Sequence, residues 1–218
     1  MIDVLEFWAT YLPQLLNGLA VSLKVTGASL MIGIPLGLIL ALTVQAKSLP
    51  IRWLSLIIVE IGRGAPALIL LQFAYFGLPN LGLSLTSFMA AVAALSWSTA
   101  AYTSEIIRAG LQAVPRGQIE ACDALGMSLA DQLRFVIVPQ GLRVAAPALL
   151  GFAVLMLQAS SLAFTIALPE LLSQAYMIGT STFRYMTILV LAGALYASIC
   201  IPATLLVSWF ERRLDRHI

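Results

Sequence analysis

Charged residues are rare in this chain of 218 residues, and four of them form two pairs with the same spacing. Glu60 precedes Arg63 by three positions, and Glu105 precedes Arg108 in the same way. Residues three apart share one face of a helix, so each pair can neutralise itself or bind a charged solute. For Arg63, a structural ion pair with Glu60 and a contact with a solute carboxylate both stay open. For Glu105 and Arg108 we expect an ion pair with each other that braces the loop that follows them.

The chain lacks the residues of a hydrolytic or metal-dependent active site. Its one histidine, His217, stands next to the C-terminus, so neither a Ser-His-Asp arrangement nor a histidine-based metal site is expected. The phosphate-binding sequence G-x-x-x-x-G-K-[ST] is also missing. Cys122 and Cys200 fall in a loop and in an apolar run, and we expect no disulfide between them. If the chain uses ATP, another chain must bind it.

The composition is that of a protein embedded in a lipid bilayer. Apolar residues make up 61% of the chain and charged residues 10%, with a mean hydropathy of +0.97. A hydrocarbon core of about 30 Å needs roughly 20 apolar residues in a helix. We therefore predict an all-α polytopic membrane protein, with a turn-rich stretch at 77–82 between the second and third spans. The five predicted spans are 15–45, 54–77, 85–110, 142–166 and 185–210.

The basic residues orient these spans, because Lys and Arg accumulate in cytoplasmic loops. Nine of the twelve fall on one side: Lys47, Arg52, Arg108, Arg116, Arg134, Arg143, Arg212, Arg213 and Arg216. The opposite side has only Arg184, while Lys24 and Arg63 lie within spans. We expect the N-terminus outside and the C-terminus in the cytoplasm.

The first fourteen residues carry Asp3 and Glu6 and no basic residue, which is the wrong charge for a signal peptide. We expect them to be retained, either along the outer membrane surface or as an extension of the first helix. Further on, Gly33 and Gly37 form a small-x-x-x-small surface around Pro35, which favours close helix packing over a gating role.

Residues 111–141 form a polar, arginine-bearing insert between the third and fourth spans. Pro115 suits the first turn of a helix. A narrow apolar stripe would follow at helical spacing, made of Ile119, Cys122 and Leu125. These features predict a first short helix within the insert.

A second short helix is predicted after Gly126, which stands where a helix ends in the left-handed conformation. Ser128 and Asp131 have the spacing of a capping box, and we expect Pro139 to end this helix. From the residues alone, a loop resting on the membrane surface and a docking site for a partner explain the insert equally well.

The insert resembles the EAA signature of ABC importer membrane subunits, which is E-A-A, three residues, G, nine residues and I-x-L-P. Glu120 and Ala121 match its start, Gly126 matches its glycine, and Val136-Ile137-Val138-Pro139 matches its end. Cys122 replaces the second alanine, and valines replace two apolar positions. The resemblance implies a coupling helix that docks on an ATPase: Ile119, Glu120, Ala121, Cys122, Asp123, Ala124, Leu125 and Gly126.

Nearly the whole chain resembles the histidine/glutamine-type permeases for polar amino acids. The matching blocks are Glu60-x-x-Arg63-Gly64-x-Pro66, Tyr75-Phe76-Gly77-Leu78-Pro79 and Tyr102-x-x-Glu105-Ile106-x-Arg108. This implies a type I importer half in the bacterial inner membrane, with no cofactor of its own and no nucleic acid partner. The implied partners are a second permease, an external solute-binding protein and two cytoplasmic ATPase subunits that bind ATP and Mg²⁺.

The fourth span departs from that family. Relatives often carry a Lys-Asp-Thr-Ser-Leu-like run, where this chain has Gln158-Ala159-Ser160-Ser161-Leu162. Either neutral groups recognise the substrate, or a partner in a heterodimer supplies the site, or these side chains satisfy one another between helices. We expect a heterodimer, with a homodimer as the alternative. The candidate path residues are Arg63, Gln72, Trp97, Tyr102, Gln158, Ser160 and Ser161, of which Trp97 and Tyr102 suit packing or path lining.

The expected function is that of a permease subunit in an ATP-driven importer of polar amino acids or their derivatives. A self-sufficient secondary transporter or channel is the alternative, although no internal repeat supports it. The expected organisation is one transmembrane domain over 1–218, with the coupling loop at 111–141 inside it.

Overall fold

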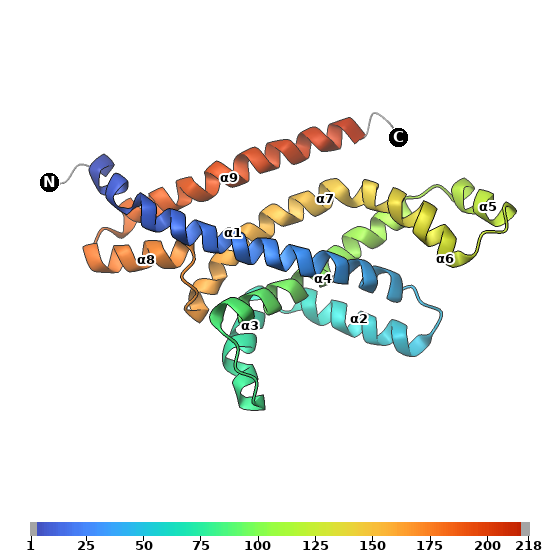
Figure 1. Ribbon diagram of the computed structural model, residues 1–218, viewed down its shortest axis with the longest axis horizontal. Coiled ribbons are helices and arrows are strands. Elements are labelled where there is room, and N and C mark those ends of the chain that lie inside the picture. The colour runs from blue at the N-terminus through green and yellow to red at the C-terminus, as the bar shows by residue number, and fades with distance from the viewer. Residues whose placement is uncertain (1–3, 215–218) are drawn as a thin grey trace.

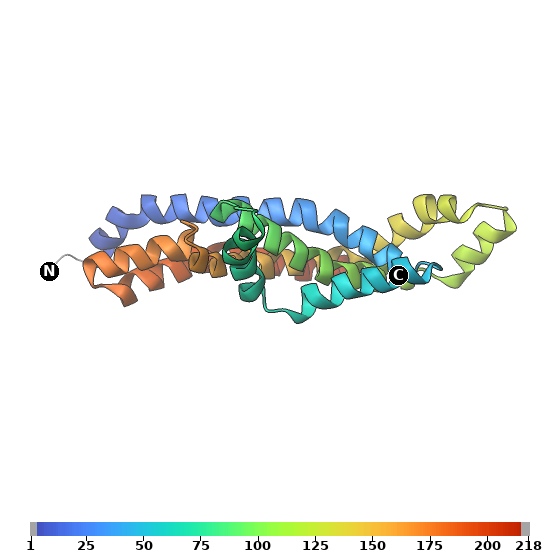
Figure 2. The ribbon, with the colours of Figure 1, turned by 90° about the horizontal axis from the view of Figure 1, so that it is seen from below.

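The structure is a computed structural model that describes residues 4–214, and every element in that range is helical. Four long helices run roughly along the long axis of the molecule (Figure 1): α1 (Val4–Thr43), α4 (Ser87–Gln112), α7 (Val138–Ala159) and α9 (Tyr185–Leu214). The other elements are α2 (Leu49–Gly64), α3 (Ala67–Gln72), α5 (Arg116–Ala124), α6 (Leu129–Asp131) and α8 (Leu171–Thr182), with the short turns η1 (Phe73–Gly77), η2 (Leu78–Leu81), η3 (Gln132–Ile137) and η4 (Ser160–Ile166). Helices α5 and α6 project at one end of the bundle, and α8 lies at the other (Figures 1 and 2).

Helix α4 occupies the centre of the bundle and packs against α1, α2 and α7. Gly33 and Gly37 of α1 face α4, where an added Cβ would overlap the side chains of Thr99 and Thr103. The helices can approach this closely only because neither glycine has a side chain. The packing role predicted for this pair of glycines is therefore confirmed.

The second predicted span is broken rather than straight. Helix α2 ends at Gly64, and the segment from Ala67 to Leu81 continues at an angle of 104° to it. Pro66 has no N–H to continue the helix, and Ala65 before it is extended at φ −79° and ψ 131°. From α3 on, the chain projects to one side of the long helices and reverses at Gly82, whose φ is +83° (Figure 1).

The fourth predicted span begins earlier than expected, because helical structure is continuous from Leu129 to Ile166. The prediction that Pro139 ends the preceding helix is wrong. The turns of η3 are of the wider π type, in which the N–H of Val138 bonds to the carbonyl of Leu133. This widening shifts the carbonyl groups away from the proline ring, so the helix continues through Pro139.

Two further differences lie at the end of the bundle that holds α8. Helix α8 was not predicted, because its 12 residues are too few to span a membrane and follow an apolar run directly. Helix α1 starts at Val4 without interruption, so the N-terminal segment is an extension of the first helix. Residues 1–3 lie outside the described part of the chain.

Within residues 4–214, three helical segments are long and apolar enough to cross a membrane: Val4–Thr43, Leu129–Ile166 and Tyr185–Arg212. The bent pair of α2 and α3 makes a fourth if it counts as one span. Helix α4 has 26 residues but is rich in Ser, Thr and Ala. The count of five spans therefore stays a prediction.

Candidate functional site: the coupling hairpin and the charged cluster

The hairpin formed by α5 and α6 is closed by standard capping interactions. Gly126 has φ +68°, its N–H bonds to Asp123 O, and the N–H of Met127 bonds to Cys122 O. This is the Schellman arrangement, in which a left-handed glycine satisfies the last carbonyl groups of a helix. The predicted helix end at Gly126 is confirmed.

The second half of the hairpin starts at the predicted N-cap. The N–H of Asp131 donates to the Ser128 hydroxyl oxygen at 3.2 Å, and that hydroxyl donates to the Asp131 carboxylate at 2.6 Å. A cap on each side of the turn fixes the direction of both short helices.

Gln132 braces the two halves and was missed by the sequence analysis. Its side-chain amide donates to Asp123 Oδ1 at 2.7 Å and to the Met127 carbonyl at 3.1 Å, and the residue is buried. Nothing in the sequence marks a glutamine nine residues after an aspartate as a contact, because the turn between them brings them together. The hairpin is therefore a braced unit rather than a loose loop.

The three residues of the predicted apolar stripe differ in their exposure. Cys122 is buried and Ile119 is half-buried, whereas Leu125 is 79% exposed. Leu129 and Phe135 beyond the turn are each 62% exposed. Exposed apolar side chains on a polar projection are typical of an interaction surface. Glu120, Ala121 and Ala124 are exposed with them.

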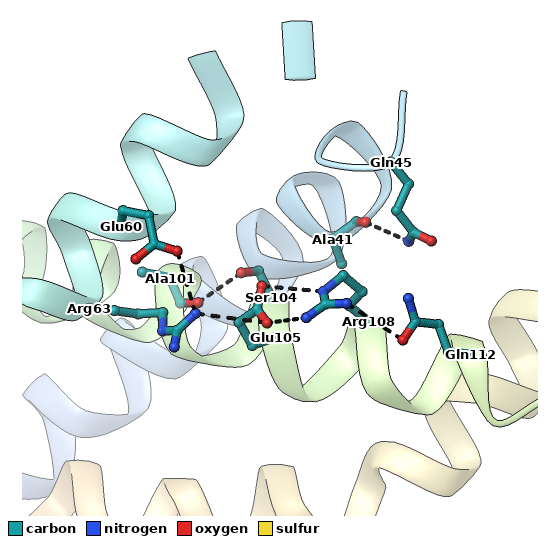
Figure 3. A network of polar contacts seen from close by, with 9 residues as sticks. All are labelled: Ala41, Gln45, Glu60, Arg63, Ala101, Ser104, Glu105, Arg108 and Gln112. Atoms are coloured by element: carbon teal, nitrogen blue, oxygen red, sulfur yellow. Dashed lines mark hydrogen bonds and ion pairs between the residues drawn. The ribbon is translucent and has the colours of Figure 1, made fainter. Parts of the chain in front are cut away.

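The charged residues of α2 and α4 form one cluster rather than two separate pairs (Figure 3). Arg63 Nη1 lies 3.8 Å from Glu60 Oε1 and 3.8 Å from Glu105 Oε2. Arg108 donates to both carboxylate oxygens of Glu105 and lies 3.5 Å from Gln112 Oε1. The predicted pairing of Glu105 with Arg108 is confirmed, and the contact between Arg63 and Glu105 across the helices is new.

The break after α2 is held by two aromatic residues of α4. Trp97 Nε1 donates to the Ile58 carbonyl at 3.1 Å, and the Tyr102 hydroxyl donates to the Arg63 carbonyl at 3.1 Å. Because α2 ends at Gly64, the carbonyl of Arg63 has no partner within the helix, and the Tyr102 hydroxyl supplies one, whereas the bond from Trp97 reaches a carbonyl inside the helix. The Tyr102 ring also stacks on Phe152 of α7 at 5.7 Å between centroids.

The polar residues around the end of the fourth span lie on different sides of η4. Ser160 is fully buried and donates to the Leu157 carbonyl at 2.7 Å. Ser161 donates to the Gln158 carbonyl at 2.7 Å, and both of these residues line an open cavity. Gln72, at the end of α3, is half-buried and does not line that cavity.

Comparison with known proteins identifies the class of this bundle. Residues 33–216 match the family described as binding-protein-dependent transport system inner membrane component, so the chain belongs to that family. It is accordingly the membrane component of a transport system, not its catalytic subunit.

Two relatives and one solved structure match nearly end to end. The arginine transport system permease protein ArtQ of Bacillus subtilis (strain 168) is 36% identical over 98% of this chain and 99% of its own length. The glutamate/aspartate import permease protein GltK of Escherichia coli O157:H7 is 35% identical over 93% of this chain and 94% of its own length. A crystal structure of an amino acid ABC transporter with histidines has a TM-score of 0.89 at 37% identity. The match covers 98% of this chain and 99% of the chain in that structure. The MetNI methionine ABC transporter, with a TM-score of 0.71 at 23% identity, shares the fold.

Proposed function

We propose that this chain forms part of the translocation path of an ATP-driven importer of polar amino acids or their derivatives in the bacterial inner membrane. The observation that carries the proposal is the braced hairpin of α5 and α6, which stands at one end of the bundle (Figure 1). Leu125 and Leu129 of this hairpin are exposed, as is Phe135 of η3. Family membership favours an importer over a self-sufficient transporter or channel. The names of the relatives support amino acids as the substrate class.

The hairpin residues Ile119 to Gly126 would dock on an ATPase and convert its closure into movement of the spans. Such a contact must transmit rigid-body motion, which a hairpin with two caps and a bracing glutamine can do. ATP and Mg²⁺ would be bound by two partner ATPase subunits, and no cofactor by this chain. A second permease, identical or different, would complete the path, and an external solute-binding protein would deliver the substrate.

The proposed topology has five spans with the N-terminus outside and the C-terminus in the cytoplasm. They are α1, the bent pair of α2 and α3, α4, the segment 129–166 and α9. Helix α4 can span the membrane with little apolar surface, because it is surrounded by other helices. Ala91, Leu95, Thr99 and Thr103 are buried against these neighbours rather than facing lipid. Within this single domain, residues 111–141 would be the cytoplasmic coupling loop.

The path would be lined by Arg63, Gln72, Trp97, Tyr102, Gln158, Ser160 and Ser161. Arg63 is 37% exposed beside the break in the second span, so it remains accessible to a substrate carboxylate. Gln158 and Ser161 offer neutral hydrogen-bonding groups. Trp97, Tyr102 and the buried Ser160 would shape the path indirectly, because each donates a hydrogen bond to a backbone carbonyl group.

The hairpin assignment is tested by Glu120→Arg and Gly126→Pro. Proline cannot adopt φ +68°, so Gly126→Pro should distort the turn while leaving the spans in place. Both variants should insert in the membrane but lose ATPase copurification and ATP-dependent uptake in proteoliposomes. Gly117→Ala is the matched control, since a Cβ there meets nothing within 4 Å. Full ATPase association and uptake by both variants would rule out this docking site.

A further inference from the structure

Among the residues that the structure describes, no cationic group pairs with the buried carboxylate at the start of α8. Glu170 is 0% exposed, and its Oε1 accepts from the N–H of Ser173 at 2.7 Å. Its Oε2 accepts from the N–H of Leu172 at 2.9 Å and from the Tyr196 hydroxyl at 3.1 Å, and lies 3.4 Å from Ser22 Oγ. The ion pairs of the described residues all lie in the charged cluster of α2 and α4. An acidic group without a cation inside an apolar bundle is a candidate for function.

Tyr196 connects this carboxylate with an open cavity of about 410 Å³. The cavity lies between the end of α7 with η4 and the middle of α9, and its lining consists of Gln158, Ser161, Tyr196, Ala197, Cys200 and Ile201. A volume of this order suits a small molecule. The lining is apolar apart from two neutral groups on one wall and the tyrosine on the other.

We propose that this cavity receives the ammonium group of the transported solute and that Tyr196 is its contact residue. The inference rests on the proposed function and names one contact residue for the solute. The Tyr196 hydroxyl donates its proton to Glu170 at 3.1 Å and lies 3.4 Å from Ser22 Oγ, and its oxygen has a second lone pair that can accept a hydrogen bond from a cationic N–H. Hydrogen bonds in such a chain strengthen one another, so the acceptor group of Glu170 makes the Tyr196 oxygen a stronger acceptor for a cation. Gln158 and Ser161 add neutral partners.

The first test is uptake by Tyr196→Phe in proteoliposomes that contain the ATPase and the binding protein. Phenylalanine keeps the ring and leaves both backbone N–H groups on Glu170, so the complex should assemble. The maximal uptake rate of radiolabelled L-arginine and L-glutamine should fall about tenfold. Tyr185→Phe is the matched control, because its hydroxyl lies 2.8 Å from Thr180 Oγ1 and outside the cavity. Equal uptake by the two variants would overturn the proposal.

The second test does not depend on transport. A cysteine replaces Ala197 in a chain that also carries Cys122→Ala and Cys200→Ala, and is treated with 2-aminoethyl and 2-sulfonatoethyl methanethiosulfonate. After correction for the reaction rates of free cysteine, the cationic reagent should react about tenfold faster than the anionic one. Adding Glu170→Gln should remove the preference. The absence of any cation preference in the parent would overturn the proposal and leave the importer assignment standing. The importer assignment itself would fail if the parent chain did not associate with an ATPase.

Discussion

At the residue scale, Glu105 is the centre of the charged cluster (Figure 3). It binds Arg108 on its own helix through two N–H groups and lies 3.8 Å from Arg63 on α2. Glu60, by contrast, is 66% exposed and touches Arg63 alone. Removing Arg63 would therefore leave no buried carboxylate without a partner, because Glu60 is exposed and Glu105 keeps Arg108.

The cluster makes a prediction about stability that ranks three conservative variants. We expect Glu105→Gln to lower the free energy of unfolding by about 1 kcal/mol, because two charge-assisted hydrogen bonds to Arg108 are lost from a partly exposed site. Arg63→Gln and Glu60→Gln should each cost a few tenths of a kcal/mol at most, as exposed ion pairs do. Thermal unfolding of the purified chain in detergent measures the order. Equal losses in all three variants would contradict the central role of Glu105.

The sequence predicted the members of the site better than their contacts. The caps at Gly126 and Ser128 were predictable because they depend on neighbours within a few residues. The bridge from Gln132 to Asp123, the contact of Arg63 with Glu105 and the burial of Glu170 depend on how separate helices meet. Spacing along one chain segment does not contain that information.

At the element scale, the contact between α1 and α4 depends on the glycines that face α4. A Cβ at Gly33 would overlap the Thr99 side chain and lie 2.9 Å from the Ser96 carbonyl. Neither the β-carbon of a buried threonine nor a backbone carbonyl can move aside without shifting the helix.

We therefore expect Gly33→Ala to reduce the free energy of unfolding by roughly 1 to 3 kcal/mol through overpacking. Gly27→Ala on the same helix is the matched control, because a Cβ there meets nothing within 4 Å. That variant should be neutral or slightly stabilising, since alanine favours the helix more than glycine does. Denaturation of both variants in the same detergent gives the comparison, and equal destabilisation would argue against close packing at Gly33.

Apolar runs predicted which segments are helical, but not how each helix starts, bends or ends. A run of about 20 apolar residues forms a helix in lipid because its backbone must bond internally. Proline has two outcomes here: at Pro66 the helix breaks by 104°, and at Pro139 a π-type turn carries it through. The choice depends on tertiary packing, such as the bonds that Trp97 and Tyr102 make to carbonyl groups of α2. Helix α8 lacked a signal because 12 residues fit neither a span nor a short loop.

At the scale of the whole molecule, the two ends of the bundle differ in a way that fits opposite faces of a membrane. One end carries α8 and the turn before α9, where Trp8 Nε1 donates to the Thr187 carbonyl and Arg184 lies over the Phe7 ring. The other end carries the braced hairpin and most of the basic residues. Trp8 at the α8 end matches the usual position of tryptophan at a membrane interface.

The proposed topology is tested by single cysteines in a chain that carries Cys122→Ala and Cys200→Ala, which removes both native thiols. Because basic residues mark the cytoplasmic side, Asn80→Cys on η2 should react with a membrane-impermeant maleimide in intact cells. Gly117→Cys on α5 should react only after permeabilisation, and both positions are exposed, so access to the reagent decides the result. A reporter fused after Ile218 should be active in the cytoplasm. Labelling of Gly117→Cys from outside would place the hairpin away from any cytoplasmic ATPase and would overturn both the topology and the docking role.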